Sequence, residues 1–407
     1  MARIAIVTQL HPCTNPRPVK EANTLAAEGH EVFFVTILQS DSMADADLDV
    51  LDERVHLLPA VDLRSGRLPK WKSLWIRGRR RLGSRLVSRF GLETISAVCH
   101  SPESLLKKCA ELNCDLYIGH IEGGLWACRE LKKKGFRVAF DLEDWHSRDG
   151  LPDAQRAFPT KTVSELESFA LNHGAYASTT SVPLAESLEE AYGGKRPAVL
   201  RNVFPLSDMD AARNGKADRE DLETPSLTWF SQTIGPGRGL EELWQALEIL
   251  RTPVQIHLRG NPRPDFAEYL KHSIPSPHRL YLHPLIPHRE LLPRISEHDV
   301  GLALEKNEPP SRDLTLTNKI FQYLQAGCAV IATKTAGQMH LADQYRDVID
   351  ATEIEPQALA AAIENLISDR DLLCRRKQQA QTLAMSELNW DQESRMFVAL
   401  VQEALNS

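Results

Sequence analysis

The 407-residue sequence lacks a long apolar run, a paired cysteine motif and a leader-like start. No stretch of about 18 apolar residues is present to span a bilayer. The seven cysteines form no C-x-x-C pair, which argues against a disulfide framework and against a zinc site of familiar spacing. The opening MARIAIVTQL reaches a polar loop too early for a secretory signal peptide. We therefore expect a cytoplasmic protein with reduced, mostly buried thiols.

Acidic residues are missing from one segment, although the formal charge of the whole chain is -7. Residues 64–92 hold ten Lys or Arg residues interleaved with apolar ones, including Trp71 and Trp75. Such a segment suits an anionic membrane surface, and a solvated basic loop is the alternative. RNA binding is a further alternative, but the negative total charge and the thin aromatic interleaving oppose it. We predict no nucleic-acid partner.

Short apolar runs and helical patterns alternate along the chain in two series. The first opens with ARIAIVT and continues through HEVFFVT and CDLYIGH, and the second opens with SLTWFSQ. Strands separated by helices are typical of a parallel sheet, so we predict an α/β protein with two Rossmann-like, doubly wound domains that face a central cleft. The predicted parts are an N-terminal domain at 1–205, a linker at 206–226, a C-terminal domain at 227–385 and a final helix at 386–407.

The loop in FSQTIGPGRGLEEL carries Gly237, Arg238 and Gly239 between a predicted strand and a predicted helix. Glycines permit a close backbone approach, and a helix start together with an arginine favours an anion such as phosphate. The loop matches neither G-x-G-x-x-G nor the P-loop pattern, and a plain glycine-rich connection with an exposed arginine is the alternative.

The stretch TNKIFQYLQAG places Lys319 at the start of a short predicted helix that ends at Gly327. Cations normally avoid the positive end of a helix, so a bound anion explains this lysine better than the helix alone does. An exposed lysine without a ligand is the alternative. A buried strand, CAVIAT, is expected to follow directly.

These two motifs and the block from DVGLALEK to VIATKTAGQ resemble the GT-B glycosyltransferases of the retaining, GT4-type class. The resemblance covers nearly the whole chain. It implies that Arg238 and Lys319 neutralise the diphosphate of a nucleotide-sugar donor, with no metal or cofactor. It also assigns Gly237 and Gly239 to the donor loop, Gln322 to the ribose and Glu305 to the sugar.

The sequence departs from that family at several positions. Where many members carry two glutamates eight positions apart, this chain has Leu314 and Gln322. An amide can still bond ribose hydroxyls. Where many members have an arginine shortly before the basic loop residue, the chain has Gln232 and Thr233. Binding of the diphosphate should therefore depend more strongly on Lys319 than it does in those members.

The resemblance extends to strand ends of the N-terminal domain. His120 follows LYIG and matches a histidine near the donor sugar, and the loop with Arg17 together with Asp141, Glu143 and His146 is assigned to the acceptor side. The alternatives are that His120 is structural and that the carboxylates cap the segment that follows them.

We therefore expect an enzyme that transfers a sugar with retention of configuration to a hydroxyl acceptor in polysaccharide or glycoconjugate biosynthesis. Its partners would be the nucleotide sugar and a glycan or lipid-linked acceptor, with residues 64–92 on a membrane. Two alternatives stay open: a nucleotide-sugar epimerase or hydrolase of the same fold, and a non-catalytic binding or adaptor protein.

Overall fold

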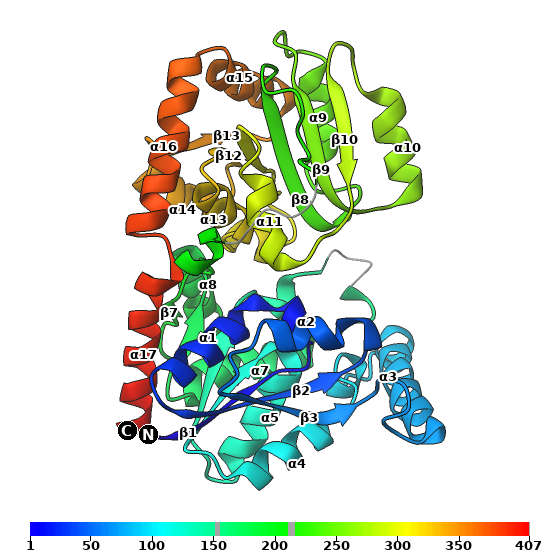
Figure 1. Cartoon of the computed structure of the whole chain (residues 1–407). Helices are drawn as coiled ribbons and strands as arrows, with labels where there is room; N and C mark the ends of the chain where they lie inside the picture. Colours follow the sequence, from blue (N-terminus) through cyan, green and yellow to red (C-terminus); the bar gives the residue numbers. More distant parts are fainter. Residues whose placement is uncertain (151–154, 211–215, 407) are drawn as a thin grey trace. The chain divides into compact units, whose positions relative to one another are not determined.

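The computed structural model describes residues 1–150, 155–210 and 216–406, which fold into two α/β units (Figure 1). Unit 1 contains Met1–Arg201, Pro309–Ser311 and the chain from Ser394 onward, and unit 2 contains Asn202–Glu308 and Arg312–Glu393. The division after Arg201 lies close to the end of the predicted N-terminal domain. The described part of the predicted linker belongs to unit 2, and most of the final helix belongs to unit 1.

Unit 1 is built on a seven-stranded sheet in which all neighbouring strands are parallel. Its strand order is β3 (Val55–Asp62), β2 (Glu31–Leu38), β1 (Arg3–Val7), β4 (Leu116–His120), β5 (Val138–Leu142), β6 (Ala177–Thr179) and β7 (Ala198–Val199). The central strands β4 and β5 are buried along their whole length, as expected for a parallel sheet that helices cover on both faces. The predicted alternation of strands and helices is confirmed.

The helices of unit 1 are α1 (Pro16–Ala27), α2 (Ala44–Asp49), α3 (Lys70–Phe90), α4 (Pro102–Leu112), α5 (Ile121–Lys133), α7 (Thr160–His173) and α8 (Val182–Tyr192). The prediction of a loop around Arg17 is wrong, because α1 already begins at Pro16. The Asn15 side chain accepts a hydrogen bond from the Arg17 amide at 3.2 Å, and a proline is well suited to the first helical position. Arg17 therefore lies in the first turn of a helix.

Unit 2 is built on a six-stranded parallel sheet with the order β10 (Arg279–His283), β9 (Gln255–Pro262), β8 (Ser226–Ile234), β11 (Val300–Ala303), β12 (Ala329–Thr333) and β13 (Ile349–Thr352). Its helices are α9 (Leu240–Leu247), α10 (Pro264–Ser273), α11 (His288–Ile295), α12 (Pro310–Leu314), α13 (Asn318–Gln325), α14 (Ala336–Gln344), α15 (Pro356–Ile367) and α16 (Arg370–Ser386), and α17 (Trp390–Asn406) closes the chain. In α12 and α17, some residues belong to unit 1.

Close packing fixes α13 directly on β11. A Cβ atom added to Gly301 would lie 2.1 Å from the ring of Tyr323, so only glycine leaves room for that ring. The hydroxyl of Tyr323 donates to the carbonyl oxygen of Leu302 at 3.1 Å. Gly327, with φ of 70°, ends the helix as predicted, and the fully buried β12 follows it.

The strand orders place one switch point in each sheet. In unit 1, strands β2 and β3 are added on one side of β1, and β4 and the later strands on the other, so the switch point lies between β1 and β4. In unit 2 it lies in the same way between β8 and β11. In open parallel sheets, ligands bind beside the carboxyl ends of the strands that flank this point. Candidate functional residues are therefore those that follow β1, β4, β8 and β11.

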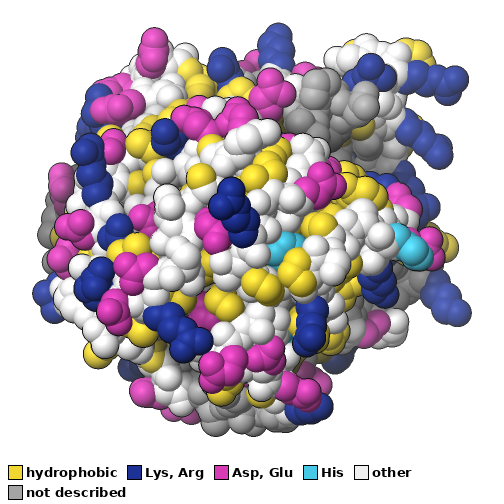
Figure 2. Space-filling view, turned by 90° about the horizontal axis from the view of Figure 1, so that it is seen from above, with side chains coloured by type: hydrophobic (Ala, Val, Ile, Leu, Met, Phe, Trp, Pro, Cys, Tyr) yellow, Lys and Arg dark blue, Asp and Glu magenta, His cyan; other side chains and the backbone are white. Residues whose placement is uncertain are grey.

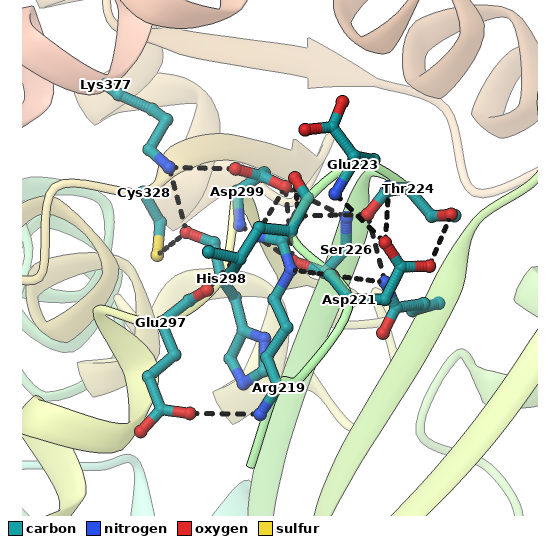
Figure 3. Close-up of polar contacts among 12 residues, drawn as sticks. Arg219, Asp221, Glu223, Thr224, Ser226, Glu297, His298, Asp299, Cys328 and Lys377 are labelled. Carbon is teal, nitrogen blue, oxygen red and sulfur yellow. Dashed lines mark hydrogen bonds and ion pairs between the residues drawn. The ribbon is translucent and has the colours of Figure 1, made fainter. Parts of the chain in front are cut away.

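The last part of the predicted linker is a tightly bonded segment (Figure 3). The guanidinium of Arg219 is buried and donates to the backbone carbonyl oxygens of Asp221, Leu222, Thr224 and Glu297. It also forms an ion pair of 2.9 Å with Asp299, which accepts a second contact of 2.9 Å from Lys377 of α16. This network anchors the segment at the amino ends of β8 and β11, the edge opposite the candidate residues.

All seven cysteines are free thiols, and five of them are buried. The prediction that most of the cysteines are buried is confirmed. None of the helices in the described part of the chain combines the length and the apolar composition that crossing a bilayer demands.

Candidate functional site

The glycine loop of unit 2 connects β8 to α9 in a conformation that needs glycine. Gly237 and Gly239 have φ values of 76° and 79°, in the left-handed region. A Cβ atom on Gly239 would lie 2.5 Å from Cβ of Leu304, and one on Gly237 would meet nothing within 4 Å. The loop thus packs through Gly239 on Leu304, the neighbour of Glu305 in the chain.

Arg238 lies between these glycines and is partly exposed. Its Nη1 atom donates to the hydroxyl of Ser231 on β8 at 3.0 Å. The neighbouring amide of Gly237 donates to a carboxylate oxygen of Glu241 at 2.7 Å. The guanidinium is therefore oriented by one hydroxyl, and among the described residues its other N–H groups have no hydrogen-bond partner, so they can meet a ligand.

Lys319 stands in the first turn of α13, as predicted. Its ammonium forms an ion pair with Glu305, lies 3.4 Å from the hydroxyl of Thr317 and sits 5.7 Å above the ring centre of Trp229. The side chains of Lys319 and Glu305 are 12% and 20% exposed, so most of the pair is shielded from water. A charge held this way loses little freedom when it binds an anion.

The ion pair determines the ionisation of Glu305. Burial raises the pKa of its carboxyl group, but the charge and hydrogen bond of Lys319, with a contribution from Arg312, outweigh burial and lower the pKa. Glu305 is accordingly a carboxylate at neutral pH and supplies a fixed negative charge beside the ammonium.

Both cations lie over the same short segment of β8. Lys319 contacts Trp229, and Arg238 contacts Ser231 two residues further along. Gln322 is buried one helical turn after Lys319. The structure thus places Lys319 and Arg238 beside neighbouring residues of β8, the strand at the switch point of the sheet. Their roles in binding a nucleotide sugar stay predictions.

In unit 1, Arg17 and Asp141 are fully paired with each other. Both side chains are buried, and the Nε and Nη2 atoms of Arg17 reach the Asp141 carboxylate at 2.9 and 2.6 Å. Nη1 donates to the carbonyl oxygen of Leu200 at 2.6 Å, and the hydroxyl of Ser178 donates to Asp141 at 2.7 Å. We expected both residues on the acceptor side, but in this structure they are bonded inside the unit. Contact with an acceptor would require this network to open.

His120, at the carboxyl end of β4, lies between two carboxylates. Its Nε2 atom is 3.0 Å from Glu21, and its Nδ1 atom is 3.6 Å from Asp141. Burial lowers the pKa of His120, but the charge of Glu21 and the contacts with Asp141 outweigh burial and raise it to about 10. The imidazole is therefore protonated at neutral pH and buried, which corresponds to the structural alternative. A direct role at a sugar stays a prediction.

Glu21, His120 and Asp141 are also close enough together to be considered as metal ligands. The carboxylate of Asp141 is already bonded by Arg17, so a metal ion would have to compete with the guanidinium for this ligand.

The segment after β5 contains three titratable groups whose pKa values are raised, one of them to near neutral pH. Glu143, Asp144 and His146 are partly exposed. Burial and the charges of Glu143 and Asp149 raise the pKa of Asp144 to about 7. Burial lowers the pKa of His146, but Glu122 and Asp144 contribute to a net rise. Such groups suit proton transfer with a hydroxyl compound.

Two features of unit 1 were missed from the sequence. Glu21 was not considered, although its spacing of four residues from Arg17 on a helix is a usable signal. Ile121 adopts φ of 57°, a strained value for a β-branched residue, directly after His120. Backbone strain of this kind is often found at functional sites. It therefore marks the turn after β4, together with its position at the switch point, as a candidate part of the site.

Together, the two parallel sheets and their helices define the GT-B fold. Along 99% of both chains, the fold matches sucrose-phosphate synthase from Thermosynechococcus elongatus, with a TM-score of 0.70 and 15% identity. It also matches HepE from Anabaena in complex with UDP, with a TM-score of 0.69 and 14% identity over 99% of this chain and 100% of that one. These likenesses show the fold.

A more distant match is a putative UDP-N-acetylglucosamine 2-epimerase from Listeria monocytogenes, with a TM-score of 0.56 and 10% identity over 98% of this chain and 96% of that one. A scan against models of protein families gives no match, and neither does a search of curated proteins.

Proposed function

We propose that the chain is a glycosyltransferase that moves a sugar from a nucleoside diphosphate sugar to a hydroxyl acceptor. The observation that carries the proposal is the placement of Lys319. Its shielded ammonium stands at a helix start, where the helix dipole disfavours a cation, and shares a segment of β8 with Arg238. A diphosphate that binds both cations explains this arrangement.

In the proposed reaction, the bond between the sugar and the diphosphate breaks and negative charge develops on the departing phosphate oxygens. Arg238 and Lys319 stabilise that charge, so a divalent ion is not needed. Glu305 keeps the ammonium of Lys319 in place, and its proposed second role is to contact the sugar. Gln322 would bond the ribose. The first nucleotide to test is UDP, because HepE, which has the same fold, is in complex with UDP.

The acceptor is proposed to bind unit 1 near Glu143, Asp144 and His146. Asp144, whose pKa is about 7, can bond the acceptor hydroxyl and hold it in place. Retention of configuration is proposed from the resemblance to the retaining class. In that class, the acceptor oxygen bonds to the sugar as the bond between sugar and diphosphate breaks, and the departing phosphate takes the hydroxyl proton. A glycan or lipid-linked acceptor is the substrate class we propose.

The test is calorimetry with UDP, GDP, ADP, dTDP and CMP, each with and without EDTA, on wild type, Lys319→Ala and Lys306→Ala. Lys306 is a matched control because it is a nearby partly buried lysine paired with Glu242 at 2.6 Å. We expect one diphosphate to bind regardless of EDTA, at least about tenfold weaker binding in Lys319→Ala, and little change in Lys306→Ala. Absence of binding by every nucleotide would overturn the donor site.

An epimerase is the second candidate, because a 2-epimerase is among the proteins of similar fold. The two functions differ in their need for an acceptor. Release of an epimerised or free sugar from the nucleotide sugar alone, at a rate that added acceptors do not raise, would favour the second candidate. Transfer that depends on an acceptor hydroxyl, with the anomeric configuration of the product read by NMR, supports the first.

A further inference from the structure

Helix α3 attaches to unit 1 through one side only. Ile76, Gly83 and Val87 are its buried residues. A Cβ atom on Gly83 would lie 2.9 Å from the backbone nitrogen of Ala97, so the helix backbone rests directly on the short helix η3 (Ile95–Ala97). The opposite side of the helix has no such neighbour within the described part of the chain and faces water.

The side that faces water carries large apolar residues. Trp71, Leu74, Trp75 and Leu82 are 71%, 69%, 60% and 57% exposed. Their spacing of three, four and eleven residues from Trp71 places them in one stripe along the helix. Single exposed apolar residues are common, but a stripe of four on one helix indicates a contact surface.

Basic residues border this stripe. Lys70, Arg81, Arg85 and Arg89 are exposed, and none of them has an ion pair with another described residue. Arg79 is the exception, because it pairs with Glu103 and lies 5.8 Å from the ring centre of Trp75. By contrast, acidic and basic side chains are interspersed over most of the face shown in Figure 2.

We propose that α3 docks on an anionic lipid bilayer and lies in the plane of the interface. The indole rings would occupy the headgroup region, the two leucines would reach the acyl chains, and the bordering cations would contact lipid phosphates. A nucleic acid would meet the cations but would leave Leu74 and Leu82 in water. The proposal concerns residues apart from Arg238 and Lys319, so it stands or falls independently of the proposed function.

The experiment is co-sedimentation of the full chain, without nucleotide, with vesicles of phosphatidylcholine alone or mixed with phosphatidylglycerol. Binding is expected to the mixed vesicles and to decline as salt is raised. Two variants of α3 test the chemistry: Trp71→Ser with Trp75→Ser, and Arg81→Glu with Arg85→Glu. Each is expected to weaken partitioning at least about tenfold, through lost apolar burial in the first and through charge repulsion in the second.

The matched control reverses two exposed lysines outside α3, Lys107 and Lys271. It makes the same change in net charge and is expected to retain most of the binding. Circular dichroism and the melting temperature establish that each variant is folded. We expect all of them to fold, because the altered side chains are exposed.

Three results would overturn the proposal. One is equal binding to neutral and anionic vesicles, and another is equal loss of binding in the control and in the α3 charge variant. The third is retention of a synthetic RNA, sensitive to Arg81→Glu with Arg85→Glu, by a chain that does not bind the vesicles.

Discussion

Glu305 and Lys319 form a mostly shielded ion pair between the second residue after β11 and the first turn of α13. Lys319 keeps the carboxyl group of Glu305 ionised, and the ion pair holds the two side chains in place. The carboxylate keeps the ammonium over Trp229, where an approaching diphosphate can share it. The pair also sets two opposing charges beside the proposed phosphate site, and their effects on binding can be separated.

The two partners are expected to affect diphosphate binding in opposite directions. Lys319→Ala removes the attracting charge and should weaken UDP binding at least about tenfold. Glu305→Gln removes a repelling charge but keeps the shape, so UDP should bind as well as before or several-fold tighter. Calorimetry at fixed ionic strength measures both variants. Glu308→Gln, which neutralises an exposed acid nearby, is the control and should change little.

The same variant tests whether Glu305 also contacts the sugar. If it does, Glu305→Gln should lower kcat with a nucleotide sugar while UDP still binds well. If the carboxylate only positions Lys319, Glu305→Gln should keep the wild-type ratio of kcat/KM between two nucleotide sugars that differ in their sugar. Weaker UDP binding in Glu305→Gln would contradict the expected direction, since it would mean that losing the hold on Lys319 outweighs losing the repulsion of the diphosphate.

The two loop glycines are expected to differ sharply in their tolerance of alanine. Both need a left-handed backbone, so each alanine should cost about 1–2 kcal/mol. Gly239→Ala must also move Leu304, whose Cβ would be 2.5 Å from the added atom, and Gly237→Ala meets nothing within 4 Å. We therefore expect a clear loss of diphosphate binding only in Gly239→Ala. Calorimetry and melting temperatures of both variants check this, and equal effects would show that the packing on Leu304 does not position the loop.

Local signals in the sequence predicted much of the fold. The alternation of apolar runs and helical patterns predicted two parallel sheets, and Gly327 predicted the end of α13. The placement of Lys319 at a helix start was visible because helix ends carry recognisable residues. Each of these depends on residues that are close together in the chain.

Partners distant in sequence could not be predicted. Glu21 and His120 are far apart along the chain, so their contact depends on how α1 packs against β4. Arg17 and Asp141 are similarly distant in sequence. Their charges suggested that both are exposed, but in the structure they are buried and paired with each other. Arg219 lies in a segment with a polar composition typical of linkers, and its buried bonds to backbone carbonyl oxygens leave no pattern in sequence.

The buried pair of Arg17 and Asp141 is expected to stabilise unit 1. Asp141→Asn leaves the Arg17 guanidinium buried without its counter-charge, which should lower the free energy of unfolding by about 3–5 kcal/mol. Glu143→Gln, at a partly exposed carboxylate nearby, is the control and should cost much less. Urea denaturation measures both. If Asp141→Asn unfolds like wild type and loses only acceptor affinity, the carboxylate belongs to the acceptor site as the sequence suggested.

Acid is expected to destabilise unit 2 through a buried histidine cluster. Nδ1 of His257 lies 3.0 Å from Nε2 of His283, and its ring lies 4.4 Å from that of His298. Burial and the neighbouring histidine charges lower the pKa of His257 to about 3 and that of His298 to about 2. Asp218 partly opposes these shifts at His257 and His283, and Arg219 and Arg259 reinforce them at His257 and His298.

The direction of this pH effect follows from the two states. An unfolded histidine takes up a proton near pH 6.5, whereas these folded ones stay neutral, so stability is full above pH 6.5 and falls as the pH drops toward 3. His120 has the opposite shift, and its contribution is fully present below pH 6.5. It therefore does not cause a loss in acid.

The measurement is the free energy of unfolding between pH 6.5 and 4.5, by urea denaturation followed through fluorescence. Each neutral histidine of the cluster should contribute a loss of about 1.4 kcal/mol per pH unit well below pH 6.5. His298→Gln removes one of them and should reduce the slope by that amount, whatever it does to stability at pH 7. His272→Gln, at an exposed histidine of α10, should leave the slope unchanged. An unchanged slope in His298→Gln would mean that His298 is protonated in the folded protein.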